Sequence, residues 1–244
     1  MINSINNEKV KEISKLKDKK YRDKSNLFLV ETYHLVEEAF NNNLLEEVFI
    51  LEDYKFNLDI KTNIINESVM KKLSSTDTIP GIVGVVRKKE EKDIIGNKIL
   101  LLDRIQDPGN LGTIIRSAVA FNVDTIILSD DTVDLYNSKV LRSAQGMIFH
   151  TNILRGNLKD YIKELKEKDF VIYGTDVNDG ISLKDIGKIE KFALIVGNEG
   201  NGITPEIREL CDKFIYIDMV KSVDSLNVGV ACSIILYEMS DISE

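Results

Sequence analysis

The sequence predicts an α/β protein in two parts, with a parallel β-sheet covered by helices in the second part. Strand-like apolar runs alternate with helix-like segments along the chain, which is typical of a parallel sheet with helices on both faces. The run Ile99–Leu102 is continuously apolar and ends at Asp103, as expected of a strand buried on both faces. The charged run Arg87–Lys92 has no apolar periodicity and indicates a linker or an edge. We therefore expect domains at residues 1–95 and 96–244.

Composition and length exclude several classes of protein. The chain has 244 residues, of which 43% are hydrophobic and 30% charged, so it has enough apolar material for a packed core. Its densest apolar stretch, Val228–Leu236, is far shorter than the roughly 20 residues of a membrane-spanning helix. Its amino-terminal residues are polar and do not resemble a signal peptide. Two cysteines and two histidines offer no disulfide framework and no metal cluster. The sequence predicts a cytoplasmic protein with no membrane segment and no metal.

The first part has the pattern of a small α/β unit. Short apolar runs predict strands, and apolar residues at helical spacing, such as Leu35, Val36 and Ala39, predict a helix. The expected strands are Leu27–Val30, Glu47–Leu51 and Ile82–Val86, and the expected helices are Thr32–Asn41 and Ser68–Leu73.

The second part alternates more clearly between strands and helices. Pro205 suits the first turn of a helix, because its missing N–H would have no partner there. The expected strands are Ile99–Leu102, Thr125–Leu128, Phe149–Leu154, Phe170–Tyr173, Phe192–Val196 and Phe214–Ile217. The expected helices are Asn110–Phe121, Ser138–Ala144, Leu158–Glu167, Thr204–Leu210 and Leu226–Met239.

A basic stretch lies near the start of a chain whose net charge is −8. Lys9–Lys24 contains eight basic and three acidic residues, a local net charge of +5. Such a stretch either contacts the phosphates of a nucleic acid or forms a solvated helix face.

Three polar, glycine-containing loops follow strands of the expected parallel sheet. Ligands of such sheets bind outside the carboxyl ends of the strands. The loops are Asp107–Thr113, Gly197–Gly202 and Ser222–Asn227. Each alone is compatible with ordinary turn chemistry, and the second lacks both the P-loop and the dinucleotide-binding patterns. Their shared position at strand ends favours a common site.

Several side chains in these loops have both a functional and a structural interpretation. Arg116 could bind a phosphate or carboxylate in a bidentate manner, or form a surface ion pair. Glu199 directly follows a strand-end segment, an unusual place for a residue that only aids solubility. Ser225 and Asn227 could act in the site or simply cap the last helix.

Three segments resemble the motifs of the SpoU, or TrmH-like, family of RNA 2'-O-methyltransferases, which belongs to the SPOUT superfamily. They are DPGNLGTIIRSA (Asp107–Ala118), LIVGNEGNGI (Leu194–Ile203) and DSLNVGVACSIILYE (Asp224–Glu238), in the order and at the spacing of the family. The segment YRDKSNLFLVE (Tyr21–Glu31) also resembles the start of the family's substrate-binding domain, which is similar to the ribosomal protein L30e fold.

The resemblance implies a fold, a cofactor and an assembly that the sequence pattern does not. The catalytic domain would be a parallel α/β sheet with a carboxyl-terminal trefoil knot, a rare feature in proteins, and the first domain would be L30e-like. The cofactor would be S-adenosylmethionine, and the protein would act on RNA as a homodimer. The implied cofactor-binding residues are Gly197, Ile217, Met219 and Leu226, and the implied catalytic and RNA-positioning residues are Asn110, Arg116, Glu199, Ser225 and Asn227.

The chain departs from the family pattern at three positions. Asp218 stands where a proline usually precedes the methionine, and Gly229 stands where a serine usually follows Asn-Val. Thr32 stands where a glycine commonly follows the acidic residue of the first domain. The first departure concerns the implied cofactor loop, and the second removes a hydroxyl from the implied site.

The resemblance predicts transfer of a methyl group to a ribose 2'-hydroxyl, with ribosomal RNA as the preferred substrate because the extra domain suits a folded RNA loop. For this family, Arg116 would be the residue that activates the hydroxyl. Because arginine stays protonated in proteins, we favour it as a group that holds phosphate or the developing alkoxide. Transfer RNA remains an alternative substrate. A non-catalytic RNA-binding protein in ribosome assembly is a second alternative, and a nucleotide-dependent enzyme of Rossmann type is a third.

Overall fold

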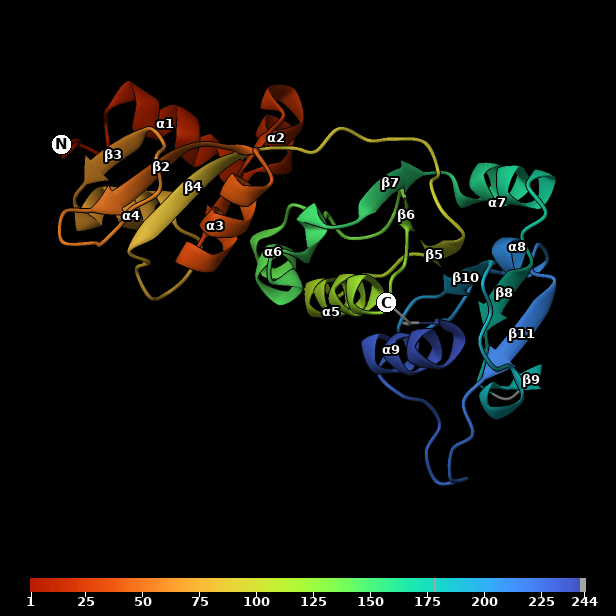
Figure 1. Cartoon of the computed structure of the whole chain (residues 1–244). Helices are drawn as coiled ribbons and strands as arrows, with labels where there is room; N and C mark the ends of the chain where they lie inside the picture. The colour runs from red at the N-terminus through yellow and green to blue at the C-terminus, as the bar shows by residue number, and fades with distance from the viewer. Residues whose placement is uncertain (178, 242–244) are drawn as a thin grey trace. The chain divides into compact units, whose positions relative to one another are not determined.

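The computed structural model describes residues 1–177 and 179–241. It divides into two compact units, each built on its own β-sheet (Figure 1). Residues 1–90 and 134–149 form the first unit, and residues 91–133 and those from 150 onward form the second. The charged run expected as a linker contains the point at which the chain first passes between units. None of the described helices has the length and apolar character needed to span a bilayer.

The first unit contains a four-stranded mixed sheet. Its strand order is β1-β4-β2-β3, in which only the β2–β3 pair is parallel. The basic stretch forms two short helices joined by the 3-10 turn η1 (Lys15–Lys17). The elements are α1 (Glu8–Ser14), α2 (Lys19–Ser25), β1 (Leu27–Glu31), α3 (Tyr33–Asn41), β2 (Leu45–Leu51), β3 (Thr62–Ile65), α4 (Glu67–Leu73) and β4 (Ile82–Arg87).

A segment from the middle of the sequence completes the core of this unit. Helix α6 (Ser138–Ala144) packs against β1, and the 3-10 turn η2 (Met147–Phe149) follows it. The ring of Phe28 lies 4.6 Å from that of Tyr136 and 6.4 Å from that of Phe149, centroid to centroid. The helix was expected from the sequence, but its grouping with the first unit was not.

The second unit contains a seven-stranded sheet in which all neighbouring strands are parallel, as predicted. The strand order is β7-β6-β5-β10-β8-β11-β9. The strands are β5 (Lys98–Leu102), β6 (Thr125–Ser129), β7 (Asn152–Gly156), β8 (Ile172–Thr175), β9 (Ile181–Ser182), β10 (Phe192–Val196) and β11 (Lys213–Tyr216). The helices are α5 (Pro108–Ala120), α7 (Leu158–Glu167), α8 (Pro205–Arg208) and α9 (Val228–Met239), with a 3-10 turn η3 (Leu183–Asp185).

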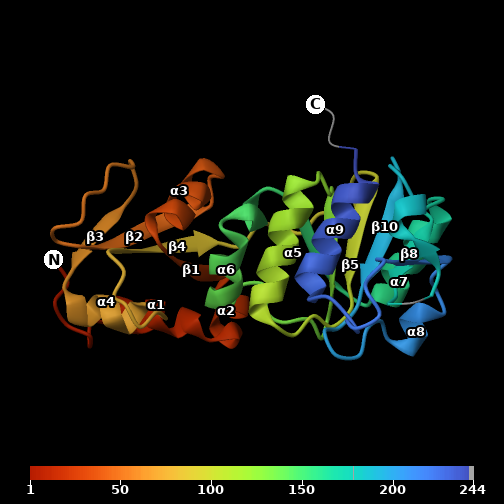
Figure 2. The same ribbon diagram turned by 90° about the horizontal axis from the view of Figure 1, so that it is seen from below.

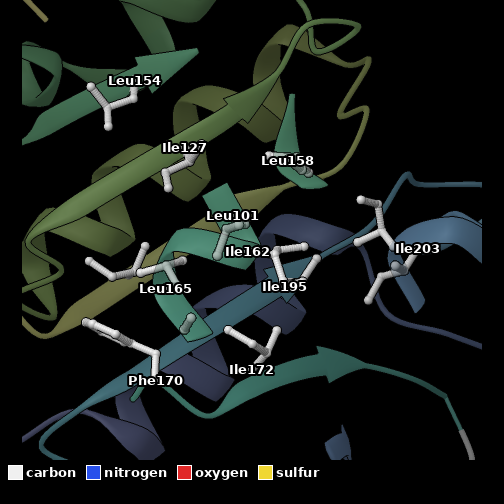
Figure 3. Packing of buried hydrophobic residues seen from close by; sticks show 13 residues of the cluster. Leu101, Ile127, Leu154, Leu158, Ile162, Leu165, Phe170, Ile172, Ile195 and Ile203 are labelled. Carbon is white, nitrogen blue, oxygen red and sulfur yellow. The ribbon is translucent and has the colours of Figure 1, made fainter. Parts of the chain in front are cut away.

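Helices cover both faces of this sheet. Figure 2 shows α5 and α9 side by side on one face, and they are in direct contact. Helices α7 and α8 lie on the other face, where Leu101 and Ile195 of the sheet pack with Ile162 and Leu165 of α7 (Figure 3). Successive strand residues point to opposite faces, so the continuous apolar runs read from the sequence fill both layers.

Strand order brings the three polar loops to one edge of the sheet. Strand β10 pairs with β5 on one side and with β8 on the other, and β8 pairs with β11. Because these strands are parallel, the segments after β5, β10 and β11 leave the sheet at the same edge. The segments after β5 and β11 lead into α5 and α9, which lie together on one face, and the segment after β10 leads into α8.

The structure differs from the predicted elements in a few places. Residues expected as a strand at Phe149–Leu154 form the end of η2 and the start of β7. Strands β3 and β9 were not expected, and β9 has only two residues. Helix α9 begins at Val228, two residues later than predicted, because Asn227 caps its first turn.

Thr32 adopts a backbone conformation that disfavours a side chain. Its φ is +118°, at the amino-terminal cap of α3, where its hydroxyl accepts a hydrogen bond from the Leu35 N–H. This is the position at which the family pattern has glycine, which adopts positive φ without steric cost. Strain of this kind costs on the order of 1–3 kcal/mol.

We expect Thr32→Gly to raise the free energy of unfolding by about 1 kcal/mol. Relief of the backbone strain contributes more than the few tenths of a kcal/mol that are lost when the capping hydroxyl is removed. Urea denaturation of the full chain measures this change. Thr32→Ala is the control, since it removes the cap and keeps the strain, and it should lower the stability. A less stable glycine variant would contradict the interpretation.

Candidate active site

The carboxylate of Glu199 joins two of the three polar loops. One oxygen, Oε1, accepts hydrogen bonds from the Asp107 N–H at 3.0 Å and from the Asn110 amide at 3.1 Å. The Gln106 N–H donates to both oxygens at 3.2–3.3 Å. The loop after β10 is thereby fixed to the segment that leads from β5 into α5.

Glu199 is exposed, yet it is surrounded by donors that favour its charged form. Burial by itself raises the pKa of Glu199, but the hydrogen bonds from Asp107, Asn110 and other donors outweigh burial and hold the pKa below its usual value. The side chain is therefore an anion throughout the neutral range, suited to accept hydrogen bonds.

Asn110 connects this network to the third loop. Its Oδ1 accepts a hydrogen bond of 2.9 Å from the Asn227 amide. Oδ1 of Asn227 in turn accepts from the Gly229 and Val230 N–H groups and so caps α9. Asp107 caps α5 in the same manner through the Asn110 N–H. The caps of two adjacent helices and the Glu199 carboxylate thus form one chain of hydrogen bonds.

Arg116 and Ser225 lie outside this chain of hydrogen bonds. Arg116 projects from α5 and is exposed, and within residues 1–177 and 179–241 no hydrogen bond or ion pair engages its side chain. The surface ion pair considered for Arg116 is therefore absent from the described part of the chain. Ser225 is exposed in the loop before α9, and the cap there is Asn227 rather than Ser225.

A cavity of about 390 Å³ opens beside Glu199. The loops after β10 and β11 and the start of α9 line it, together with the end of β8. The four residues implied as cofactor ligands all line it: Gly197, Ile217, Met219 and Leu226. Glu199 and Ser225 line it as well. Asn110, Arg116 and Asn227 are not among the lining residues. The volume is within the range of about 300–1,000 Å³ typical of small-molecule sites.

Gly197 is required by the close fold of its own loop. Asn198 and Gly202 exchange backbone hydrogen bonds of 3.0 and 2.9 Å, which closes the loop on itself. A Cβ at Gly197 would lie 2.2 Å from backbone atoms of Gly202 and Ile203. No side chain can occupy that space, so the glycine permits the close approach.

Two charged residues of the cavity were not expected from the sequence. Arg208 of α8 forms ion pairs with Asp176 and Asp179, which follow β8, and its guanidinium lies 4.1 Å from the ring centroid of Phe214. Asp176 and Arg208 both line the cavity. The signal available in the sequence was that Asp176 follows a predicted strand, as the three polar loops do.

The two departures from the family pattern in this unit have local structural partners. Asp218 accepts a hydrogen bond from the Ser182 hydroxyl and pairs with Lys184 at 3.3 Å, so it ties the segment after β11 to β9 and η3. These contacts lower the pKa of Asp218, the Ser182 hydrogen bond most strongly. At Gly229, a Cβ would lie 3.2 Å from Cγ2 of Thr113 on α5. A side chain at residue 229 would therefore make a tight contact with Thr113, which would have to shift slightly to accept it.

Three of the eight basic residues of the basic stretch make specific contacts within the first unit. Lys9 pairs with Glu47, Lys17 donates to the Ser74 carbonyl, and Arg22 is buried against Asp134. These three cations therefore do not belong to a freely solvated face. The remaining basic residues of the stretch are exposed: Lys11, Lys15, Lys19, Lys20 and Lys24.

Across residues 1–177 and 179–241, no three His, Cys, Asp or Glu side chains come together in a way that could hold an ion.

The model of the SpoU rRNA methylase family matches residues 97–237, which include all three loops. The chain belongs to the SpoU rRNA methylase family. A second model, that of the MRM3-like substrate-binding domain, matches residues 7–84. The chain is therefore an S-adenosylmethionine-dependent methyltransferase, as members of this family are.

Similar proteins share both the length and the fold of the chain. It is 41% identical over 243 residues to the 23S rRNA (guanosine(2553)-2'-O)-methyltransferase RlmP of Bacillus subtilis, covering 98% of each chain. An S-adenosylmethionine-bound rRNA methyltransferase from Sinorhizobium meliloti is 27% identical, with a TM-score of 0.86 and coverage of 97% and 95%. The SpoU methyltransferase AviRb of Streptomyces viridochromogenes, 23% identical, shares the fold with a TM-score of 0.85 over 95% and 96% of the chains.

Ionised Glu199 should stabilise the fold in a pH-dependent manner. The pKa of Glu199 is lower in the folded chain than in the unfolded chain, where it is about 4.3. The stabilisation is therefore fully present above the pKa of the unfolded chain and is lost as the pH falls through the pKa of the folded chain. We expect Glu199→Gln to lower the Tm at pH 7, and the difference from the parent protein to shrink between about pH 5 and pH 3.

Thermal unfolding followed by circular dichroism across this range measures the effect. Glu167→Gln at the exposed end of α7 makes the same change of charge and serves as the control. A Tm difference that stayed constant with pH would contradict the role of the Glu199 charge.

Proposed function

We propose that the chain transfers a methyl group from S-adenosylmethionine to a ribose 2'-hydroxyl of ribosomal RNA. The observation that carries the proposal is the hydrogen-bonded chain Glu199–Asn110–Asn227 beside the cavity, with Arg116 exposed on the helix that Asp107 caps. The 41% identity to the Bacillus subtilis 23S rRNA enzyme supports 23S rRNA as the substrate. Ribosomal RNA as substrate implies action in the cytoplasm.

The cavity residues fit the proposed cofactor. Ile217 and Leu226 supply apolar surface for a base, while Asp176 and Arg208 supply charges that can meet an amino-acid group. Loop backbone around Gly197 supplies further hydrogen-bonding groups. When bound, S-adenosylmethionine supplies an electrophilic methyl carbon for in-line displacement.

The other residues would align the RNA. Arg116 is free to donate to a phosphate or to the alkoxide that develops on the ribose, and its planar group can do so through two N–H bonds. The Glu199 network would hold the amino-terminal end of α5, and thus Arg116, in a fixed position. Most of the rate gain from such a site comes from orientation.

The two domains would have separate roles, one in RNA binding and the other in methyl transfer. We assign residues 1–95 to binding of folded RNA in an L30e-like domain and residues 96–244 to methyl transfer. The match of a substrate-binding model to residues 7–84 supports the first assignment. The exposed lysines of α1 and α2 would then contact the RNA backbone.

We also infer a trefoil knot and a homodimer, both typical of the family. In support of the knot, the segment from β11 to α9 lines the same cavity as the loop after β10. In support of the dimer, α9 exposes an apolar row on one face, with Val230 46%, Ile234 39% and Tyr237 57% exposed. Such a row on a soluble protein favours contact with a second copy.

Methylation of RNA by purified protein tests the proposed activity. We expect methyl-labelled S-adenosylmethionine to label a ribose 2'-oxygen of unmodified 23S rRNA, identified after digestion to nucleosides. Arg116→Ala should reduce turnover by about 100-fold, because a donor to developing charge is lost, while calorimetric binding of the cofactor stays unchanged.

Other results of the methylation assay would favour one of the alternative functions. Label on a base would contradict the mechanism, and label only on transfer RNA would favour the alternative substrate. Cofactor binding without methylation of either RNA would favour a non-catalytic ribosome-assembly protein. Near-normal turnover of Arg116→Lys would count against the bidentate role.

A charge placed in the apolar row of α9 tests the dimer. Ile234→Glu should convert the protein to a monomer in size-exclusion chromatography with light scattering, because a carboxylate buried without a partner is strongly unfavourable. Lys163→Gln on α7 is the control, since it changes one exposed charge outside the row. An unchanged molar mass for Ile234→Glu, or a monomeric parent protein, would refute this interface.

A further inference from the structure

A small polar hollow in the first unit is not accounted for by the proposed function. Its volume is about 80 Å³, and its lining includes Lys17 and Arg22, the end of β1 at Glu31, Tyr136 before α6 and Ser138, the first residue of α6. We call it the Arg22 pocket. All of its lining residues belong to the first compact unit.

Arg22 is buried without being fully hydrogen-bonded. Its residue exposure is 7%, its Nη1 donates to the Leu16 carbonyl at 2.8 Å and to the Lys17 carbonyl, and its Nη2 pairs with Asp134. The remaining donor, Nε, is buried and has no partner in the described chain. A buried donor without a partner costs free energy and is rare in native proteins.

Other unpaired donors lie in the same neighbourhood. Within the described residues, five buried side-chain polar atoms have no partner, and three of them belong to Arg22, Arg142 and Ser74. Arg142 lies near Glu31 and Ser138, which also line the Arg22 pocket, and the Ser74 carbonyl accepts from Lys17. Of these three residues, Arg22 lines the pocket, so its Nε could donate to an acceptor group bound there.

The charges around the pocket favour an anion. Lys17, Arg22 and Arg142 contribute three positive charges, and Lys72 is near enough to act on Lys17. Against them stand Asp134, paired with Arg22, and Glu31, whose oxygens accept from the Ser75 N–H and the Thr76 hydroxyl at 2.7 and 3.1 Å. Burial lowers the pKa of Lys17, with Lys72 adding to the effect and Glu31 opposing it. A bound anion would offset the excess positive charge.

We propose that the Arg22 pocket binds a phosphate group. Its oxygens can accept from several donors at once, and arginine and lysine are the side chains that bind phosphate best. The group could be a phosphodiester of RNA, in which case the inference rests on the proposed RNA substrate, or free inorganic phosphate.

Calorimetric titration of the full chain with inorganic phosphate is the first arm of the test. Sodium chloride at equal ionic strength controls for salt, and a rise in Tm with phosphate is the second readout. Lys17→Gln should weaken phosphate binding by about tenfold or more, since it removes a charged donor. Lys163→Gln makes the same change at an exposed position of α7 and should leave phosphate binding unchanged. Circular dichroism verifies that both variants are folded.

The second arm measures binding of a 23S rRNA fragment at several salt concentrations. A phosphodiester in the pocket predicts that Lys17→Gln reduces the slope of log Kd against log salt by about 1. Weakened phosphate binding with an unchanged slope would identify free phosphate as the ligand. If Lys17→Gln changes neither phosphate binding nor the slope, the phosphate site is refuted. Neither arm needs methyl transfer, so failure of the proposed activity would leave this test intact.

Discussion

The carboxylate of Glu199 is the point on which the site depends. It accepts hydrogen bonds from the Gln106 and Asp107 N–H groups and from the Asn110 amide. Through Asn110 it also reaches Asn227. Three loops that are far apart in the sequence therefore have a common anchor. A neutral side chain would accept these bonds more weakly, because hydrogen bonds to a charged acceptor are about twice as strong as neutral ones.

The parallel sheet and its helices position Glu199 and the residues that it contacts. Four neighbouring parallel strands deliver their loops to one edge, and α5 and α9 begin there with their caps, Asp107 and Asn227. The caps satisfy helix N–H groups and at the same time fix Asn110 and the start of α9 relative to each other. Arg116 is then held by a helix rather than by a loop, and within residues 1–177 and 179–241 no partner occupies its side chain.

The sequence predicted the parallel sheet and the loops at its edge because apolar runs and strand-end polarity are local signals. It predicted no contact between particular side chains, since the Glu199–Asn110 and Asn110–Asn227 bonds join residues about 90 and 117 positions apart. Asp176 and Arg208 were missed because an ion pair across two elements leaves no periodic pattern. The basic stretch was ambiguous for the same reason: only the fold separates buried Arg22 from exposed lysines such as Lys20.

The most direct test of the account is a double-mutant cycle between Glu199→Gln and Asn227→Ala, measured on kcat/KM for RNA methylation. The two side chains are joined only through Asn110 in the hydrogen bonds described above. If the three loops act as one unit, the effects should be coupled by about 0.5–3 kcal/mol. Effects that add within about 0.5 kcal/mol would show that the loops act independently, and would contradict the central place given to Glu199.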